Sequence, residues 1–169
     1  SNLIIDDTPG ISISEMRSKC RKYKMEHNLD LIIIDYLQLC DMNTGQKNRN
    51  REQEVAQATR KAKLLAKELH IPVVLLSQLN RESENRPGGR PELAHLRESG
   101  AIEQDADVVL FLYRAAYYNS QNGETEQANE NEAECIVAKN RHGETSVVRL
   151  GWDGAHTRFS NLDEIHEQY

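Results

Sequence analysis

The chain has 169 residues, of which 38% are apolar, 28% charged and 5% aromatic, enough for one domain with a hydrophobic core. Lys and Arg number 21 and Asp and Glu 27, which gives a formal net charge of -6. This balance excludes binding of nucleic acid through bulk positive charge, so any such contact must be local. No apolar stretch approaches the roughly 20 residues that a membrane helix needs, and we expect no contact with a membrane.

The three cysteines are Cys20, Cys40 and Cys135, and none belongs to a C-x-x-C pair. Their odd number and wide spacing predict free thiols in a reducing compartment, not a disulfide or zinc framework. No basic-then-apolar leader opens the sequence, which favours a soluble cytoplasmic protein.

The first part of the chain predicts a strand, a turn and an amphipathic helix. Residues 2–6 form a short β-type run, and the Asp-Thr-Pro-Gly of residues 7–10 is typical of a turn. Ser12 lies three residues before Glu15, the spacing of a capping box, and we expect a helix from there to about His27. Its apolar side is Ile13, Met16, Cys20 and Tyr23. Five Lys and Arg on the other side favour a solvated surface over a binding patch.

The middle of the chain predicts alternating strands and helices. Residues 31–39 read LIIIDYLQL, and their four consecutive aliphatics predict a central parallel strand covered by helices on both faces. Residues 52–69 predict a helix and residues 73–77 a second buried strand. The apolar helix positions are Val55, Ala58, Ala62, Leu65 and Leu69. This alternation predicts an α/β fold with a mainly parallel sheet and ligands at the carboxyl ends of the strands, after Asp35 and Gln78.

The remainder predicts loops, an insertion and a hairpin. Polar residues 41–51 and 80–96 predict loops on the ligand side, and residues 108–113 predict a further strand. Residues 119–134 hold five glutamates and no basic residue, which predicts a mobile acidic insertion within the single domain of residues 1–169. Two β-runs, 133–139 and 145–150, predict a hairpin whose turn at 140–143 has positive φ angles.

Asp35 and Gln78 are the first candidates for chemistry. A carboxylate at the end of an all-aliphatic strand is typical of a Walker B site, which supports the magnesium ion of a bound nucleotide. An aspartate that only caps the next loop is the alternative. Gln78 could contact a γ-phosphate or merely stabilise a turn. The sequence contains no G-x-x-x-x-G-K-[ST] loop, so it holds half of a nucleotide site.

Five stretches of the chain form a recognisable series. They are IIDDTPGIS (4–12), LIIIDYLQL (31–39), SQLNR (77–81), RP-x-L-x-x-LRESGAIEQDAD (90–107) and AKNRHGET (138–145). In this order and spacing they resemble the carboxyl-terminal motor domain of DnaB-type bacterial replicative DNA helicases. The resemblance runs from about residue 2 to residue 160. It implies an incomplete RecA-like P-loop NTPase sheet, mainly parallel, with a carboxyl-terminal antiparallel β-hairpin.

The resemblance also implies roles for individual residues. Asp35 stands at the Walker B aspartate that supports Mg²⁺ on ATP, and Gln78 at the sensing glutamine. Lys139 and Arg141 match the basic pair that reaches the neighbouring subunit's nucleotide, where Arg141 would be the arginine finger. Without the resemblance, this pair could equally be edge-strand charges that prevent aggregation.

DNA contacts follow from the same resemblance. Arg97, Glu98 and Gly100 match the loop that holds the backbone of single-stranded DNA in the centre of a six-membered ring. A surface ion pair is the other interpretation of Arg97 and Glu98.

The family implies a homo-hexamer. This ring couples ATP hydrolysis to translocation on single-stranded DNA and to duplex unwinding during replication. Its primosome partners are primase and a helicase loader. Members of the family carry a collar domain, a linker helix, a phosphate loop and a catalytic glutamate upstream of these motifs. We therefore expect this chain alone to be inactive and to self-associate non-specifically instead of forming a ring. The alternatives are a stand-alone, non-hydrolysing DNA-binding or helicase-docking module and, less favoured, a recombinase-type or clock-type ATPase.

Overall fold

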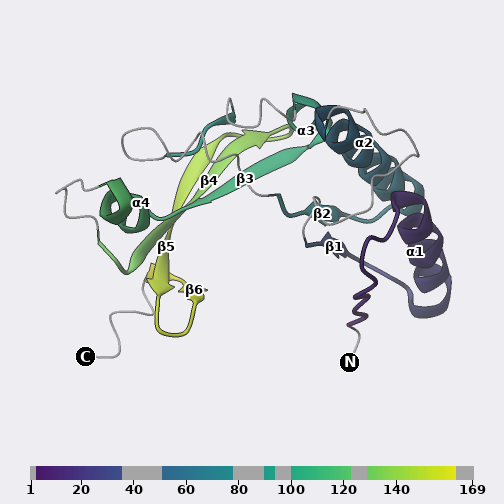
Figure 1. Ribbon diagram of the computed structural model, residues 1–169, viewed down its shortest axis with the longest axis horizontal. Coiled ribbons are helices and arrows are strands. Elements are labelled where there is room, and N and C mark those ends of the chain that lie inside the picture. The colour runs from purple at the N-terminus through teal and green to yellow at the C-terminus, as the bar shows by residue number, and fades with distance from the viewer. Residues whose placement is uncertain (1–2, 36–50, 78–89, 94–99, 123–128, 163–169) are drawn as a thin grey trace. The chain divides into compact units, whose positions relative to one another are not determined.

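The chain divides into two compact units, each with its own sheet. Figure 1 shows the computed structural model, which describes residues 3–35, 51–77, 90–93, 100–122 and 129–162. The first unit comprises residues 1–78 and 98–106, and the second comprises residues 79–97 and 107–169. That the two units make a single domain stays a prediction from the sequence.

Helix α1, Ile13–His27, begins and ends as its sequence predicts. The Ser12 hydroxyl accepts a hydrogen bond from the backbone N–H of Glu15 at 3.1 Å, which satisfies one of the free donors at the helix start. Asn28 ends the helix in the left-handed conformation, with φ 52°. Ile13 and Cys20 are buried, so the predicted apolar side faces the core.

The expected strand at residues 2–6 was wrong for its described part, because residues 3–6 form no strand and are exposed. A strand pairs its backbone groups in a ladder, and residues 3–6 belong to neither of the two described sheets. Side chains tie this segment to α1 instead. Asp6 Oδ1 accepts hydrogen bonds from the Thr8 N–H at 3.1 Å and the Thr8 hydroxyl at 2.6 Å, and Asp6 Oδ2 pairs with Lys19 Nζ at 2.8 Å. The predicted turn is present, with Gly10 at φ 64°.

A strand–helix–strand unit forms the centre of the first unit. Strands β1, Ile32–Ile34, and β2, Val73–Leu75, pair in parallel, and α2, Arg51–Leu69, connects them. Helix α2 ends at Leu69, and His70 follows it with φ 53°, before Pro72. This confirms the predicted parallel strands, although the described parts are shorter than the apolar runs.

Only one face of this strand pair is covered by α1 and α2. Ile32 and Ile34 are buried with residues of both helices, whereas Ile33 is 61% exposed and Val74 is 46% exposed. The expectation that helices cover both faces was therefore wrong for the described residues. The burial follows the two-residue period of a strand with one covered face.

Leu65 lies at the centre of the core of the first unit and is 1% exposed. The buried cluster around it draws on both helices and both strand regions. Its members are Ile13, Cys20, Ile32, Ile34, Ala58, Leu65, Leu69 and Ile71. Ile102 of α3, Gly100–Asp105, packs against the cluster.

The second unit is a four-stranded antiparallel sheet in the order β3-β4-β5-β6. The strands are β3, Val108–Tyr113; β4, Glu132–Asn140; β5, Ser146–Asp153; and β6, Arg158–Ser160. This confirms the predicted hairpin. The expectation of a mainly parallel sheet was wrong for the described strands, because β4 runs back along the whole length of β3.

Both ends of the predicted insertion at residues 119–134 belong to regular elements. Its first residues complete α4, Ala115–Asn122, where Asn119 is buried, and its last residues begin β4, where Ala133 is buried. Glu134 of β4 forms an ion pair with Arg90, with 2.5 Å between the charged atoms. Residues 123–128 lie outside the described residues, so mobility of this segment stays a prediction.

The turn of the β4–β5 hairpin does not use positive φ angles, which corrects the prediction for residues 140–143. Gly143 instead leaves room for the Asn140 side chain, because a Cβ there would lie 2.6 Å from Asn140 Nδ2. The Asn140 side chain spans the turn, with Nδ2 3.4 Å from the Glu144 carbonyl oxygen that accepts from it.

Cys20 and Cys135 are free thiols, as predicted, and burial raises the pKa of Cys20. Cys40 lies outside the described residues. None of the described helices is long and apolar enough to cross a membrane.

Leu65→Ala should lower the free energy of unfolding of the first unit by about 2–5 kcal/mol, because it leaves a cavity in the core. Urea denaturation followed by circular dichroism measures this. Leu64→Ala is the matched control, since Leu64 directly precedes Leu65 in α2 and is 57% exposed. Equal losses for the two variants would contradict the position of Leu65 in the core.

Asp6 should make stability depend on pH in the acid range. The hydrogen bond from Lys19, helped by Thr8, lowers the pKa of Asp6 from 3.8 to about 2. Because the folded-state pKa is depressed, the stabilisation is present above pH 3.8 and is lost as the pH falls towards about 2. The urea midpoints of the wild type and Asp6→Asn should therefore differ at neutral pH and converge across this window. Asp7→Asn is the control, and a convergence of the same size for it would contradict the prediction.

Candidate functional site

The carboxyl ends of β1 and β2 lie side by side at one edge of the first unit. Ile34 pairs with Leu75, and the backbone N–H of Leu76 donates to the Ile34 carbonyl at 3.0 Å. Asp35 directly follows β1 and is exposed at this edge. Gln78 lies outside the described residues, and Ser77 is the last described residue before it. The parallel register thus gives the shared edge that the sequence predicted.

The exposed Asp35 carboxylate is compatible with a magnesium ion that is bound mainly by phosphate oxygens and water. Among the described residues, no group of three His, Cys, Asp or Glu side chains could form a metal site of its own. Mg²⁺ dehydrates reluctantly and typically takes one or two carboxylates together with substrate phosphates. A single exposed carboxylate at a strand end provides one such ligand.

Arg141 is held against the beginning of β3. Its backbone N–H donates to the Asp107 carbonyl at 2.8 Å, and its guanidinium Nη1 lies 3.1 Å from Asp107 Oδ1. The Arg141 side chain is nevertheless 44% exposed. One residue thus anchors the turn through its backbone and presents part of a guanidinium to solvent.

Lys139 lies two residues earlier, on β4 opposite Val109. The pairing of β4 with β5 extends only as far as Val137, so this end of β4 is paired on one side. Lys139 could therefore still be a charge that protects a strand edge from aggregation, which is the alternative to a role at a nucleotide. The structure brings Lys139 and Arg141 together at the same end of the hairpin, within the second unit, whereas Asp35 belongs to the first unit.

The predicted DNA-binding residues are described only in part. Gly100 is the first residue of α3, whereas Arg97 and Glu98 lie outside the described residues. Ile102 packs against the core of the first unit. The described part of the LRESGAIEQDAD run thus joins a packed helix to Asp107.

Two features were not predicted from the sequence. Asp107 ends the LRESGAIEQDAD motif, and an acidic residue directly before a strand could have suggested a partner for a basic turn. Arg114 follows β3 and stacks its guanidinium over the only tryptophan, Trp152, at 4.2 Å from the ring centroid. This cation–π contact links the residue that follows β3 to β5, across the intervening β4.

Comparisons with known proteins show to which family the chain is similar. Residues 1–161 match the family described as DnaB-like helicase C terminal domain. The replicative DNA helicase DnaB of Geobacillus stearothermophilus is 46% identical over 168 residues, which cover 99% of this chain and 36% of that protein. The replicative DNA helicase DnaC of Bacillus subtilis is 48% identical over 163 residues, which cover 96% of this chain and 35% of that protein. This chain therefore spans about a third of the length of these curated relatives.

Solved structures give the same result, each at 39% sequence identity. A DnaB-like replicative helicase, described with its interactions with primase, superposes with a TM-score of 0.82 over 94% of this chain and 37% of that chain. A separately solved ATPase domain superposes with a TM-score of 0.80 over 90% of this chain and 52% of that chain. From its sequence and its fold, the chain belongs to the family of DnaB-like replicative helicase C-terminal domains.

Proposed function

We propose that this chain forms part of the motor of a ring-shaped replicative DNA helicase that couples ATP hydrolysis to movement on single-stranded DNA and duplex unwinding. The observation that carries the proposal is the position of Asp35, exposed at the shared carboxyl edge of two parallel strands, in a chain that belongs to the helicase family. Ligands of open α/β sheets bind at this edge.

ATP with Mg²⁺ supplies the phosphoryl-transfer chemistry when bound. Asp35 would hold the metal through one carboxylate oxygen or through a bound water. Gln78 follows β2 by three residues and would contact the γ-phosphate from the neighbouring strand end. Because β1 and β2 are joined by a backbone hydrogen bond at Leu76, a shift at one strand end would be felt at the other.

Lys139 and Arg141 would act on the nucleotide of the neighbouring subunit. A planar guanidinium can bridge two phosphate oxygens, and it neutralises charge that develops on the transferred group. Asp107 would serve as a positioning residue, since it holds the backbone and the guanidinium of Arg141 at the end of the hairpin. The half-exposed guanidinium is accessible from outside its own subunit.

Arg97, Glu98 and Gly100 would contact the DNA. Contacts to the phosphate backbone through an arginine and backbone amides do not depend on base sequence, as a translocating motor requires. The partners that we propose for the whole protein are five further copies of itself, single-stranded DNA, primase and a helicase loader. The primase proposal draws support from the related helicase whose structure is described with its primase interactions.

A chimera tests the roles of Asp35 and Arg141. In it, this chain replaces the matching third of the Geobacillus stearothermophilus helicase, to which it is 46% identical. We expect DNA-stimulated ATP hydrolysis, and we expect Asp35→Asn and Arg141→Ala each to reduce kcat by about a thousandfold or more. Arg149→Ala is the matched control, because Arg149 is a 69% exposed arginine of the same sheet.

Mixing the two inactive chimeras distinguishes action on a neighbour from action within one subunit. Mixed rings contain interfaces where an intact Asp35 faces an intact Arg141 of the next subunit, so activity should return in part. No recovery would contradict the proposed action in trans. An unmutated chimera that assembles and binds DNA but hydrolyses no ATP would instead favour a non-hydrolysing module.

Arg97→Ala should weaken binding of single-stranded DNA to the chimera equally for all base sequences. Loss of one phosphate contact should reduce the slope of log affinity against log salt by about 0.7. Fluorescence anisotropy over a salt series measures both effects. Arg60→Ala, on the exposed side of α2, is the control, and an unchanged slope for Arg97→Ala would rule out a phosphate contact.

A further inference from the structure

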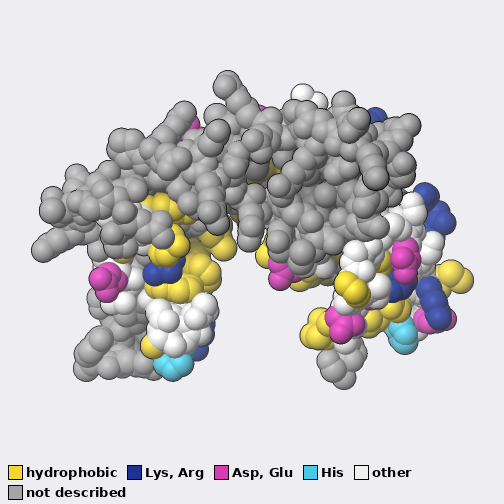
Figure 2. All heavy atoms as spheres, viewed as in Figure 1, with side chains coloured by type: hydrophobic (Ala, Val, Ile, Leu, Met, Phe, Trp, Pro, Cys, Tyr) yellow, Lys and Arg dark blue, Asp and Glu magenta, His cyan; other side chains and the backbone are white. Residues whose placement is uncertain are grey.

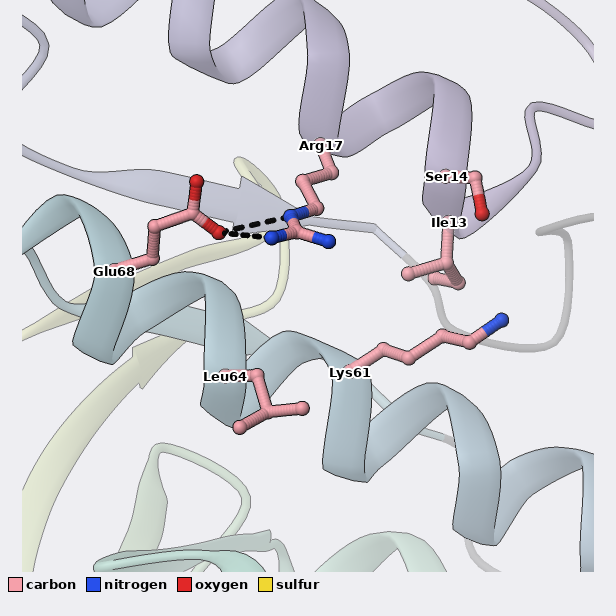
Figure 3. Close-up of a pocket in the computed structure, with 6 residues that line it drawn as sticks. All are labelled: Ile13, Ser14, Arg17, Lys61, Leu64 and Glu68. Atoms are coloured by element: carbon pink, nitrogen blue, oxygen red, sulfur yellow. Dashed lines mark hydrogen bonds and ion pairs between the residues drawn. The ribbon is translucent and has the colours of Figure 1, made fainter.

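A hollow of about 310 Å³ lies between α1 and α2 in the first unit. Figure 3 shows its six lining residues, three from each helix. They are Ile13, Ser14, Arg17, Lys61, Leu64 and Glu68. We call this hollow the α1–α2 groove. Its volume is at the lower end of the range of small-molecule sites and suits a few inserted side chains.

The groove has an apolar floor. Ile13 is buried, while Leu64 is 57% exposed and offers a large apolar side chain to a partner. Ser14 is small, which leaves the space open beside Ile13. The aliphatic stems of Lys61 and Arg17 add apolar surface beneath their charged ends.

The rim of the groove is cationic. Arg17 Nη2 lies 2.7 Å from Glu68 Oε2, and Arg21 also pairs with Glu68, as Figure 3 shows for Arg17. The hydrogen bonds from Arg21 and Arg17 lower the pKa of Glu68, which stays ionised and is matched by two guanidinium groups. Lys61 makes no ion pair with another described residue and adds a further positive charge.

This local charge opposes the charge of the rest of the chain. Helices α1 and α2 together carry ten Lys and Arg against five Glu, whereas the rest carries eleven against twenty-two. Figure 2 shows Lys and Arg side chains at the right-hand edge of the view, where Figure 1 places α1. A solvated surface would explain the charges alone, and it is the hollow between the two helices that distinguishes this face.

We propose that the α1–α2 groove is a docking site for an acidic amphipathic helix of a partner protein. Apolar side chains at one face of such a helix would enter the groove over Ile13 and Leu64. Its carboxylates would meet Arg17 and Lys61 at the rim. Helices bind hydrophobic grooves in this way through anchors spaced three or four residues apart.

The apolar floor distinguishes a helix from the backbone of a nucleic acid. A phosphate backbone binds through cations and polar donors and gains little from Leu64 or Ile13. Glu68 at the groove would repel it, whereas a protein helix can place its carboxylates away from Glu68. The observations therefore favour a protein partner.

The test uses the 169-residue chain and a fluorescein-labelled helical peptide of Leu, Glu and Ala, with leucines at positions i, i+3, i+4 and i+7. Anisotropy should show saturable binding that weakens as salt is added. Lys61→Glu should weaken binding about threefold to tenfold. Leu64→Gln should weaken it about tenfold, because an apolar anchor is lost.

Arg60→Glu is the matched control, because Arg60 precedes Lys61, is exposed and does not line the groove. It should leave binding nearly unchanged. A peptide of the same composition with its leucines spread around the helix should bind poorly, as should one with Lys in place of Glu. Circular dichroism checks that each variant is folded.

Several results would overturn the proposal. Equal weakening by Arg60→Glu and Lys61→Glu would indicate diffuse charge, and equal binding of the rearranged peptide would indicate non-specific association. Tighter Lys61-dependent binding of a single-stranded oligonucleotide would make the groove a nucleic-acid surface. If Leu64→Gln instead changes the molar mass measured by light scattering and leaves peptide binding intact, the occupant is a second copy of this chain.

Discussion

The parallel register of β1 and β2 is the constraint on which the first unit depends. Ile32 and Ile34 must face the helices together, because a slip of one residue would turn both side chains to solvent. Leu65 in α2 packs into the core beneath them and keeps the connecting helix on that face. The same register brings the ends of the two strands together, so the position of Asp35 is a consequence of core packing.

The position of Arg141 depends on a different kind of contact. The antiparallel sheet carries it to the end of the β4–β5 hairpin, and Asp107 holds its backbone and its side chain there. A guanidinium on a loose turn would have to lose its freedom on binding, whereas this one is already partly ordered. The rigid sheet thus supports a residue whose proposed target lies in another subunit.

The local elements could be predicted from the sequence, because they rest on patterns within a few residues. The capping box at Ser12, the helices 13–27 and 51–69 and the strand 108–113 follow from spacing and periodicity. The wrong predictions concern which elements pair with or pack against each other. Residues 3–6 have the composition of a strand but belong to none of the described strands, and Ile33 belongs to an aliphatic run whose second face is exposed. Composition cannot show which face of a strand is covered.

By itself, the sequence determined the order of helices and strands, the placement of Asp35 after an aliphatic strand, and the motifs that are similar to the helicase family. These are properties of neighbouring residues. Only the tertiary structure decided that β3 pairs with β4 in the antiparallel sense, that Asp107 holds Arg141, and that α1 and α2 leave a groove between them. Each of these joins residues far apart in the chain, and such contacts depend on how whole elements pack, which no local pattern specifies.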